Sequence, residues 1–261
     1  MTPQPKSFQR WLPALLLCLA AAAAIGCTPA TMNPIPIVRF DQEGKPPKPV
    51  LLVFLPGRGD NGARFDTEGF VSAARRAGIP ADMIAVDAHM GYYLERNLPE
   101  KLYRDVITPA RLRGYRHIWL VGISMGGLGA LWYDIGHPGD LAGIVILAPY
   151  LGDPEVVAEV VRAGGMSAWQ PADAVPDDQR KIWKGLKVYE DREKSRGRVF
   201  LGYGRQDRFA EANGLLAAVL PPEQVFLIDG GHDWETWKDL WARILRRLPL
   251  NGGEGQRPLL E

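Results

Sequence analysis

Cysteine is nearly absent from this sequence, which contains only Cys18 and Cys27 among its 261 residues. Cys18 lies in an N-terminal segment that we expect to be removed, so one cysteine remains and no internal disulfide can form. No cysteine pair has the spacing of a zinc site either. Packing of a hydrophobic core must therefore stabilise the fold, and a hydrophobic content of 46% is sufficient for it.

An excess of charge of one sign is also absent, with 31 Lys and Arg residues against 30 Asp and Glu residues. This balance gives no indication of a nucleic-acid partner, and we expect a monomer that binds none. The chain also lacks a G-x-x-x-x-G-K phosphate-binding loop, and its four histidines show no metal-binding spacing. We therefore expect an enzyme-sized globular domain that uses neither a metal nor another cofactor.

No hydrophobic run reaches the roughly 20 residues that a transmembrane helix needs. The uncharged stretch at residues 11–26 has 16 residues and contains Pro13. It follows Lys6 and Arg10, with no acidic residue before it, and it ends in small residues. This layout predicts a secretory signal peptide over residues 1–26 rather than a permanent anchor.

The end of this segment, Ala24-Ile25-Gly26-Cys27, resembles a bacterial lipobox. The resemblance implies that Cys27 is acylated and anchors the protein to a membrane of the bacterial cell envelope. Ala24 stands where lipoboxes favour leucine, so ordinary cleavage near residues 22–24, giving a secreted or periplasmic protein, is the alternative. Residues 27–49 are then a lipidated cysteine and a tether, because residues 28–49 contain six prolines and favour extended chain.

From residue 50 onward, short apolar runs alternate with amphipathic segments, which predicts a parallel sheet flanked by helices. The predicted domain covers residues 50–248, with an irregular insertion at about 164–196 that should cover a site and a frayed tail over 249–261. Residues 37–40 are expected to add an edge strand. The predicted strands are Val50–Leu55, Met83–Asp87, Ile118–Ile123, Gly143–Ala148, Val199–Tyr203 and Val225–Ile228. The predicted helices lie near residues 64–77, 98–113, 126–136, 154–163, 208–219 and 234–247.

The third of these strands leads into a G-x-S-x-G motif at residues 122–126. Gly122 and Gly126 remove the Cβ atoms that would crowd Ser124 in the sharp turn, so its hydroxyl can project at the sheet edge. The N-terminus of the following helix favours negative charge at this point. The pattern predicts that Ser124 is a catalytic nucleophile rather than a serine in a glycine-rich helix cap.

With this motif, residues 50–248 resemble the α/β-hydrolase superfamily and, within it, serine esterases of the carboxylesterase, phospholipase and esterase D kind. The resemblance implies an α/β-hydrolase fold, mostly a parallel sheet with helices on both faces and a short lid insertion. It also implies a catalytic acid after the strand at 199–203 and a histidine after the last strand. Asp207 and His232 occupy these positions, in the chain order of the family. They would complete a Ser-His-Asp triad with Ser124.

A triad also needs two hydrogen-bond donors for the oxyanion of the tetrahedral intermediate. The resemblance implies that the backbone amide of Met125 is one of them. The other should come from the loop after the first predicted strand, from the amide of Arg58 with Gly57 as the alternative. Related esterases carry His-Gly in this loop, whereas this chain has Pro56-Gly57.

Aromatic residues on the segments that should border the site predict an apolar pocket for an acyl or alkyl group. We therefore expect a small-molecule or lipid ester as the substrate. An acyltransferase or thioesterase on the same triad is an alternative, and a non-catalytic, envelope-tethered binding protein on a hydrolase scaffold is another. The expected pocket residues are Tyr92, Tyr93, Trp169, Trp183, Phe209 and Trp234.

Overall fold

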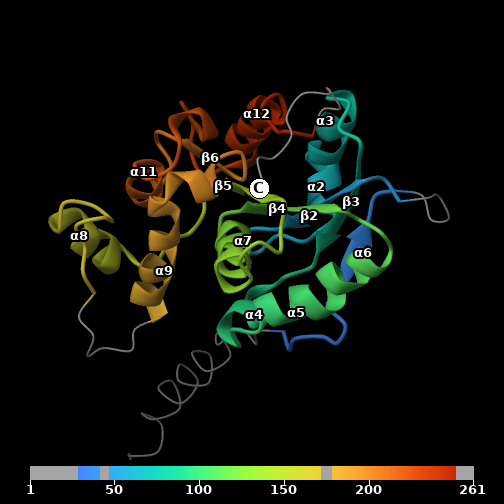
Figure 1. Cartoon of the computed structure of the whole chain (residues 1–261), viewed down its shortest axis with the longest axis horizontal. Coiled ribbons are helices and arrows are strands. Elements are labelled where there is room, and N and C mark those ends of the chain that lie inside the picture. Colours follow the sequence, from blue (N-terminus) through green and yellow to red (C-terminus); the bar gives the residue numbers. More distant parts are fainter. Residues whose placement is uncertain (1–28, 42–46, 172–177, 251–261) are drawn as a thin grey trace, which may run out of the picture. The chain divides into compact units, whose positions relative to one another are not determined.

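A seven-stranded sheet in the order β1-β3-β2-β4-β5-β6-β7 forms the framework of the protein (Figure 1). This computed structural model describes residues 29–41, 47–171 and 178–250. All neighbouring strands are parallel except β1, which pairs antiparallel with β3 at one edge. The strands are β1 (Ile37–Arg39), β2 (Val50–Leu55), β3 (Ala81–Val86), β4 (His117–Ile123), β5 (Gly143–Leu147), β6 (Val199–Gly204) and β7 (Val225–Ile228).

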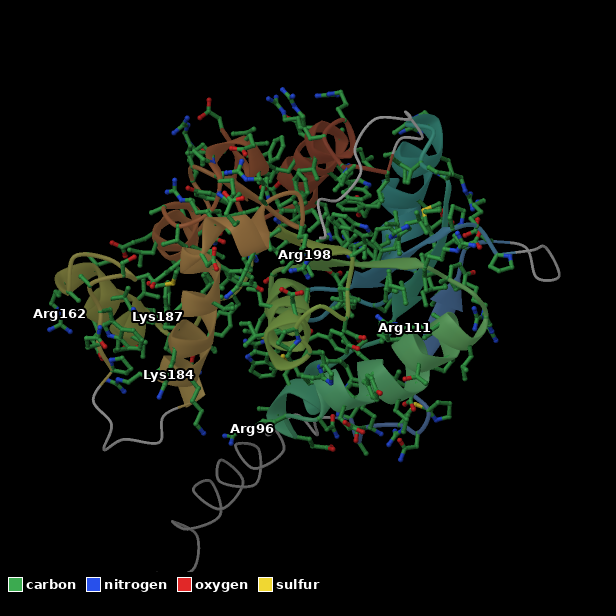
Figure 2. The ribbon with its side chains drawn as sticks, viewed as in Figure 1. Arg96, Arg111, Arg162, Lys184, Lys187 and Arg198 are labelled. Carbon is green, nitrogen blue, oxygen red and sulfur yellow. The ribbon has the colours of Figure 1, made fainter. Side chains whose placement is uncertain are left out.

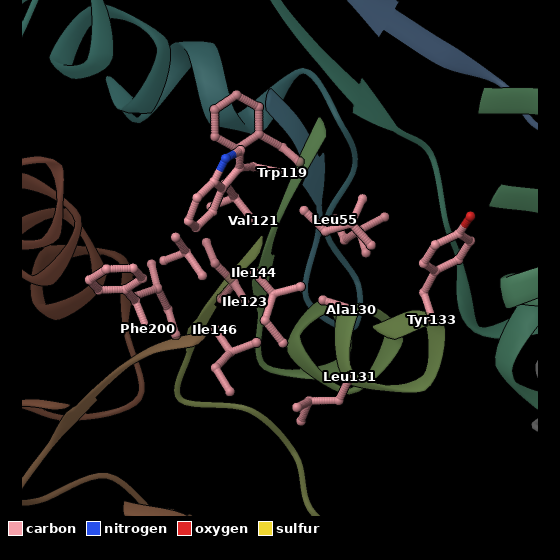
Figure 3. Packing of buried hydrophobic residues seen from close by; sticks show 14 of the residues in the cluster. Leu55, Trp119, Val121, Ile123, Ala130, Leu131, Tyr133, Ile144, Ile146 and Phe200 are labelled. Atoms are coloured by element: carbon pink, nitrogen blue, oxygen red, sulfur yellow. The ribbon is translucent and has the colours of Figure 1, made fainter. Parts of the chain in front are cut away.

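The central strands are apolar along their whole length because both faces of the sheet are covered. All six residues of β2 and all five of β5 are buried. Figure 1 shows α3 (Phe70–Arg76) and α12 (Trp234–Leu245) on one side of the strands, and α7 (Met125–Gly136) with α5 (Leu98–Leu102) on the other. Side chains of β4 and β5 pack beside those of α7, as Figure 3 shows for Ile123, Ile146 and Leu131.

The helices follow the sequence-based expectation, with local breaks that have physical causes. The expected helix near 64–77 is divided into α2 (Arg64–Thr67) and α3 by Gly69, whose φ of +82° no α-helix accommodates. The expected helix near 98–113 contains a π-helical turn at Tyr103–Ile107 between α5 and α6 (Thr108–Leu112). This turn ends two residues before Pro109, which has no N–H to continue regular bonding. The remaining helices are α4 (Met90–Leu94), α8 (Pro154–Arg162), α9 (Asp178–Leu186), α10 (Arg192–Ser195) and α11 (Ala210–Ala217).

The insertion between β5 and β6 is more regular than the sequence indicated. After the segment 172–177, which lies outside the described residues, it forms α9, a 3-10 turn at Lys187–Glu190 and α10. Tyr189 in the 3-10 turn donates its hydroxyl to Asp134 on α7, at 2.9 Å. This part of the insertion is therefore fastened to the helix that follows Ser124.

The N-terminal residues join the domain earlier in the sequence than expected. The signal peptide, Cys27 and residues 251–261 lie outside the described residues, whereas residues 37–39 form the expected edge strand. The expected tether over 27–49 is wrong for residues 32–40, because the Met32 amide donates to the Tyr92 hydroxyl and Ile35 is 2% exposed. These residues belong to the domain. Within the described part of the chain, no helix is both long and apolar enough to cross a membrane.

Candidate active site

Ser124 occupies a strained turn between β4 and α7. Its φ of 52° and ψ of −114° are rarely adopted by a residue with a side chain. A Cβ on Gly122 would lie 2.2 Å from the Gly126 carbonyl oxygen, and a Cβ on Gly126 would lie 2.0 Å from that of Leu55. Only glycine fits at either position, so the G-x-S-x-G motif is required by the close approach of three backbone segments.

The side chains of Ser124, His232 and Asp207 form a continuous hydrogen-bonded chain. The Ser124 Oγ lies 2.9 Å from His232 Nε2, and His232 Nδ1 lies 2.8 Å from Asp207 Oδ2. Ser124 is 6% exposed and Asp207 is 5% exposed, whereas His232 is partly exposed. The fold thus brings together three residues that are distant in the sequence, with the carboxylate shielded from water and the imidazole between it and the hydroxyl.

The loops that carry Asp207 and His232 are hydrogen-bonded to each other. The Gln206 side-chain oxygen accepts a hydrogen bond from the Gly230 backbone amide at 2.6 Å, and the Gln206 backbone amide donates to the Gly230 carbonyl at 3.0 Å. A Cβ on Gly204 would lie 2.2 Å from the same carbonyl oxygen. Asp207 Oδ1 accepts a hydrogen bond from the Phe209 backbone amide at 2.8 Å, which fixes the orientation of the carboxylate. The distance between Asp207 and His232 is therefore set by backbone contacts.

The position of His232 is fixed from the other side by the start of α12. Asp233 is the N-cap of this helix and accepts hydrogen bonds from the backbone amide and the hydroxyl of Thr236. The hydrogen bond from the Thr236 backbone amide lowers the pKa of the Asp233 carboxyl below its ordinary value. Asp233 therefore stays ionised at neutral pH and holds the loop at the helix N-terminus.

The loop after β2 lies against the nucleophile. Gly57 is buried, and a Cβ on it would lie 3.5 Å from the Ser124 Cβ. The Asp60 amide donates to the Gly57 carbonyl at 3.2 Å, closing a tight turn that contains Arg58. Met125 is the first residue of α7. The structure thus places Gly57 and Met125 on two sides of Ser124, with Arg58 next in the loop and exposed.

Aromatic rings surround the imidazole. The Phe209 ring lies 4.9 Å from the His232 ring at 82°, and the Trp237 ring lies 5.0 Å from it at 89°, both in edge-to-face geometry. Trp234 packs 5.4 Å from Trp237 and is partly exposed, as is Phe209. Of the six expected pocket residues, Phe209 therefore borders the site, whereas the Trp234 ring packs against Phe65 and Phe70 and is connected to His232 through Trp237.

The other four expected pocket residues are core residues, and the expectation for them does not agree with the structure. Tyr92 and Trp183 are 0% exposed, Trp169 is 1% exposed and Tyr93 is 6% exposed. The Tyr92 hydroxyl accepts the Met32 amide, and the Trp169 indole donates to Glu159 on α8. Burial on this scale leaves no surface for a substrate, because these large side chains fill the spaces between the helices and the sheet.

Tyr150 and Trp237 are site residues that the sequence analysis missed. The Tyr150 amide donates to the Ser124 carbonyl at 3.0 Å, and its partly exposed ring lies 5.5 Å from Phe209. Its position directly after the strand next to β4 could have indicated this location, because the carboxyl ends of parallel strands meet at one edge. Trp237 lies three residues after Trp234, on the same face of α12.

The insertion reaches the edge of the site through Gln179 at the start of α9. The Gln179 Oε1 accepts the Tyr150 hydroxyl at 3.4 Å and the Asp153 amide at 3.1 Å. Trp183 lies one turn later in the same helix and is fully buried. No group of three or more His, Cys, Asp or Glu residues within the described part of the chain could hold a metal ion.

Comparison with known proteins identifies the family of this chain. The model of the Esterase family matches residues 92–248. A search of curated protein sequences gave no match.

Solved structures share the fold at low sequence identity. A ferulic acid esterase is 19% identical, with a TM-score of 0.53 and coverage of 80% of this chain and 86% of that chain. The S-formylglutathione hydrolase of Staphylococcus aureus is 13% identical, with a TM-score of 0.55 and coverage of 85% and 99%. A monoacylglycerol lipase of Paleococcus ferrophilus is 16% identical, with a TM-score of 0.53 and coverage of 82% and 98%. The chain has the α/β-hydrolase fold and belongs to the Esterase family of carboxylic ester hydrolases.

Proposed function

We propose that the protein hydrolyses carboxylic esters through an acyl-enzyme on Ser124. The observation that carries the proposal is the hydrogen-bonded chain from Asp207 through His232 to the Ser124 hydroxyl, with distances of 2.8 and 2.9 Å. Asp207 accepts the Nδ1 proton, so the Nε2 atom of a neutral imidazole is free to accept the Ser124 proton. This tautomer makes His232 a general base toward Ser124.

In the first half of the reaction, Ser124 Oγ attacks the ester carbonyl carbon while its proton moves to His232 Nε2. The tetrahedral intermediate then collapses, and Nε2 gives this proton to the leaving alcohol oxygen. In the second half, water attacks the acyl-enzyme with the same proton transfers, which releases the acid and restores Ser124. The imidazolium that forms twice in each cycle is stabilised by the buried Asp207 carboxylate.

The oxyanion of both tetrahedral intermediates needs donors that are in place before the reaction. We assign these to the backbone amide of Met125 and that of Arg58, with the Gly57 amide as the alternative. Support for this assignment comes from the tight packing of Gly57 against Ser124 and from the location of Met125 at the N-terminus of α7. The partly exposed rings of Tyr150 and Phe209 would border the reacting ester, which suits an apolar acyl or alkyl group.

The location that we propose is the bacterial cell envelope. The proposal depends on the lipobox-like residues 24–27 and on acylation of Cys27, which the four residues 28–31 separate from Met32 in the described domain. An anchor so close to the domain would keep the enzyme at the membrane surface, where lipid esters are concentrated.

The experiment that tests the proposed function is the hydrolysis of para-nitrophenyl butyrate by the Ser124→Ala variant. Loss of the nucleophile should lower kcat by about 10³-fold or more with no loss of thermal stability, because only one hydroxyl is removed. Ser72→Ala on α3 removes a hydroxyl that donates to the Gly69 carbonyl and accepts from the Arg76 guanidinium, both within four residues of it, and serves as the matched control. Near-normal turnover by Ser124→Ala would exclude the proposed function.

A further inference from the structure

Two arginines that have no acidic partner among the described residues lie on the loops next to Ser124 and His232. Arg58 follows Gly57 in the loop after β2, and Arg208 follows Asp207 in the loop after β6. Both side chains are exposed, and neither forms an ion pair with any described residue. By contrast, Figure 2 labels Arg111 and Arg198, which pair with Asp140 at 2.7 Å and Asp134 at 3.0 Å.

Each arginine is connected to the reacting atoms by a short series of contacts. The Arg208 guanidinium carbon lies 4.8 Å from the centre of the Phe209 ring, which is itself 4.9 Å from the His232 ring. On the other side, a Cβ on Gly57, the residue before Arg58, would lie 3.5 Å from the Ser124 Cβ. One cation therefore packs on the aromatic ring that contacts the base, and the other belongs to the residue that follows the one packed against the nucleophile.

Three acidic residues on the loops around the site form ion pairs or hydrogen bonds with other groups. Asp60 pairs with Arg64 at 3.2 Å, and Asp229 pairs with Arg205 at 3.3 Å. Asp153 accepts the Tyr150 hydroxyl, and burial followed by this bond raises the pKa of Tyr150, so that the phenol stays neutral.

Glu211, three residues after Arg208, is exposed and lies beyond ion-pair distance of it. The charges of Arg58 and Arg208 are consequently not neutralised by a direct partner, and they act on whatever enters the site.

We propose that the substrate is an ester that carries an anionic group, a carboxylate or a phosphate, held by Arg58 and Arg208. Guanidinium groups form paired hydrogen bonds with both anions, and their orientation at an aromatic face is typical of Arg. The inference rests on the proposed function, because it concerns the substrate that Ser124 attacks. The aromatic rings of Tyr150 and Phe209 would contact the apolar part of the same molecule.

The test compares matched neutral and anionic esters. The para-nitrophenyl ester of pentanoic acid and the para-nitrophenyl monoester of glutaric acid differ by a terminal carboxylate on the acyl group. Dibutyrylglycerol and dibutyryl phosphatidic acid differ by a phosphate on the alcohol. The quantity measured is the ratio of kcat/KM for the anionic ester to that for the neutral one. Effects of a substitution on the oxyanion itself are common to both esters and cancel in this ratio.

We expect the wild-type ratio to exceed one for at least one of the two pairs and to fall as ionic strength rises. Arg58→Gln and Arg208→Gln should each lower it about fivefold, which corresponds to a fully hydrated charge pair at about 4 Å. Arg247→Gln is the matched control, because Arg247 is exposed, without an ion pair among the described residues, and follows the far end of α12.

The pair that shows the preference identifies the anion as a carboxylate or a phosphate. The inference would be overturned if the wild-type ratio of kcat/KM is at or below one for both ester pairs. It would also be overturned if the ratio is unchanged in the variant that combines Arg58→Gln and Arg208→Gln. Hydrolysis of the neutral esters that still depends on Ser124 would in that case leave the proposed function standing. Absence of Ser124-dependent hydrolysis of every ester would refute the proposed function itself.

Discussion

Replacing Asp207 by asparagine should stop turnover by moving one hydrogen atom on His232. In the wild-type protein the carboxylate accepts the Phe209 amide at Oδ1 and the His232 Nδ1 proton at Oδ2, each at 2.8 Å. The Phe209 N–H can only donate, so the asparagine must turn its carbonyl oxygen to it and its NH₂ group to Nδ1. Nδ1 then becomes the acceptor, the proton resides on Nε2, and Ser124 has no base.

The expected magnitude follows from the loss of general-base catalysis while the other elements remain. We expect kcat to fall by about 10⁴-fold, or about 5.5 kcal/mol in the activation free energy, with little change in KM. Thermal stability should change little, because the bond to the Phe209 amide is retained and a buried charge is removed.

The assay is steady-state hydrolysis of para-nitrophenyl butyrate, together with a thermal melt of each variant. Asp229→Asn makes the same chemical change at a carboxylate whose side chain is 86% exposed, and it should keep kcat within about twofold. The reasoning would be refuted if Asp207→Asn kept more than about a tenth of the wild-type kcat while remaining folded.

Three further predictions concern location, core packing and alkaline stability. Cys27→Ser should move the protein from the membrane fraction to the soluble fraction, and retention in the membrane at high salt would contradict a lipid anchor. Trp183→Ala should lower the unfolding free energy by about 3–5 kcal/mol, because loss of this fully buried ring leaves a cavity. If the variant remains folded, kcat/KM should fall equally for acetate and decanoate esters. A selective loss on decanoate would show that Trp183 contacts the substrate. Burial, followed by the effect of Asp134, raises the pKa of Tyr189 well above its ordinary value, so stability should be lost as pH rises above about 10, where the unfolded tyrosine ionises first. Melting temperatures between about pH 8 and 11 should fall less steeply for Tyr189→Phe, and an equally steep fall would exclude this contribution.

The strands could be predicted from the sequence because parallel strands covered on both faces are apolar throughout. The expected and observed limits are identical for β2 and β7, and β3 begins two residues earlier than expected. The site residues were also accessible to this reasoning, since Ser124 and the loops of Asp207 and His232 each follow the carboxyl end of a strand. Helix α4 was missed because five residues are too few to show helical periodicity.

The pocket could not be predicted in the same way. Composition indicates that an aromatic residue is buried, but the face of its element that meets the core depends on packing between distant segments. Trp183 and Gln179 illustrate this, because both lie on one side of α9, yet only Gln179 reaches Tyr150 at the edge of the site. Trp237 was not among the expected pocket residues, because its contact with the His232 ring depends on how α12 packs after the last strand.

The central claim is that Ser124 is an activated nucleophile, and covalent labelling tests it most directly. A fluorophosphonate probe reacts with a serine only when a base removes its proton and donors stabilise the oxyanion. After labelling and proteolysis, mass spectrometry should locate a single adduct on the peptide containing Ser124, with none in Ser124→Ala and a strongly reduced rate of labelling in His232→Ala. An unlabelled wild-type protein, or an adduct that persists in Ser124→Ala, would contradict the account.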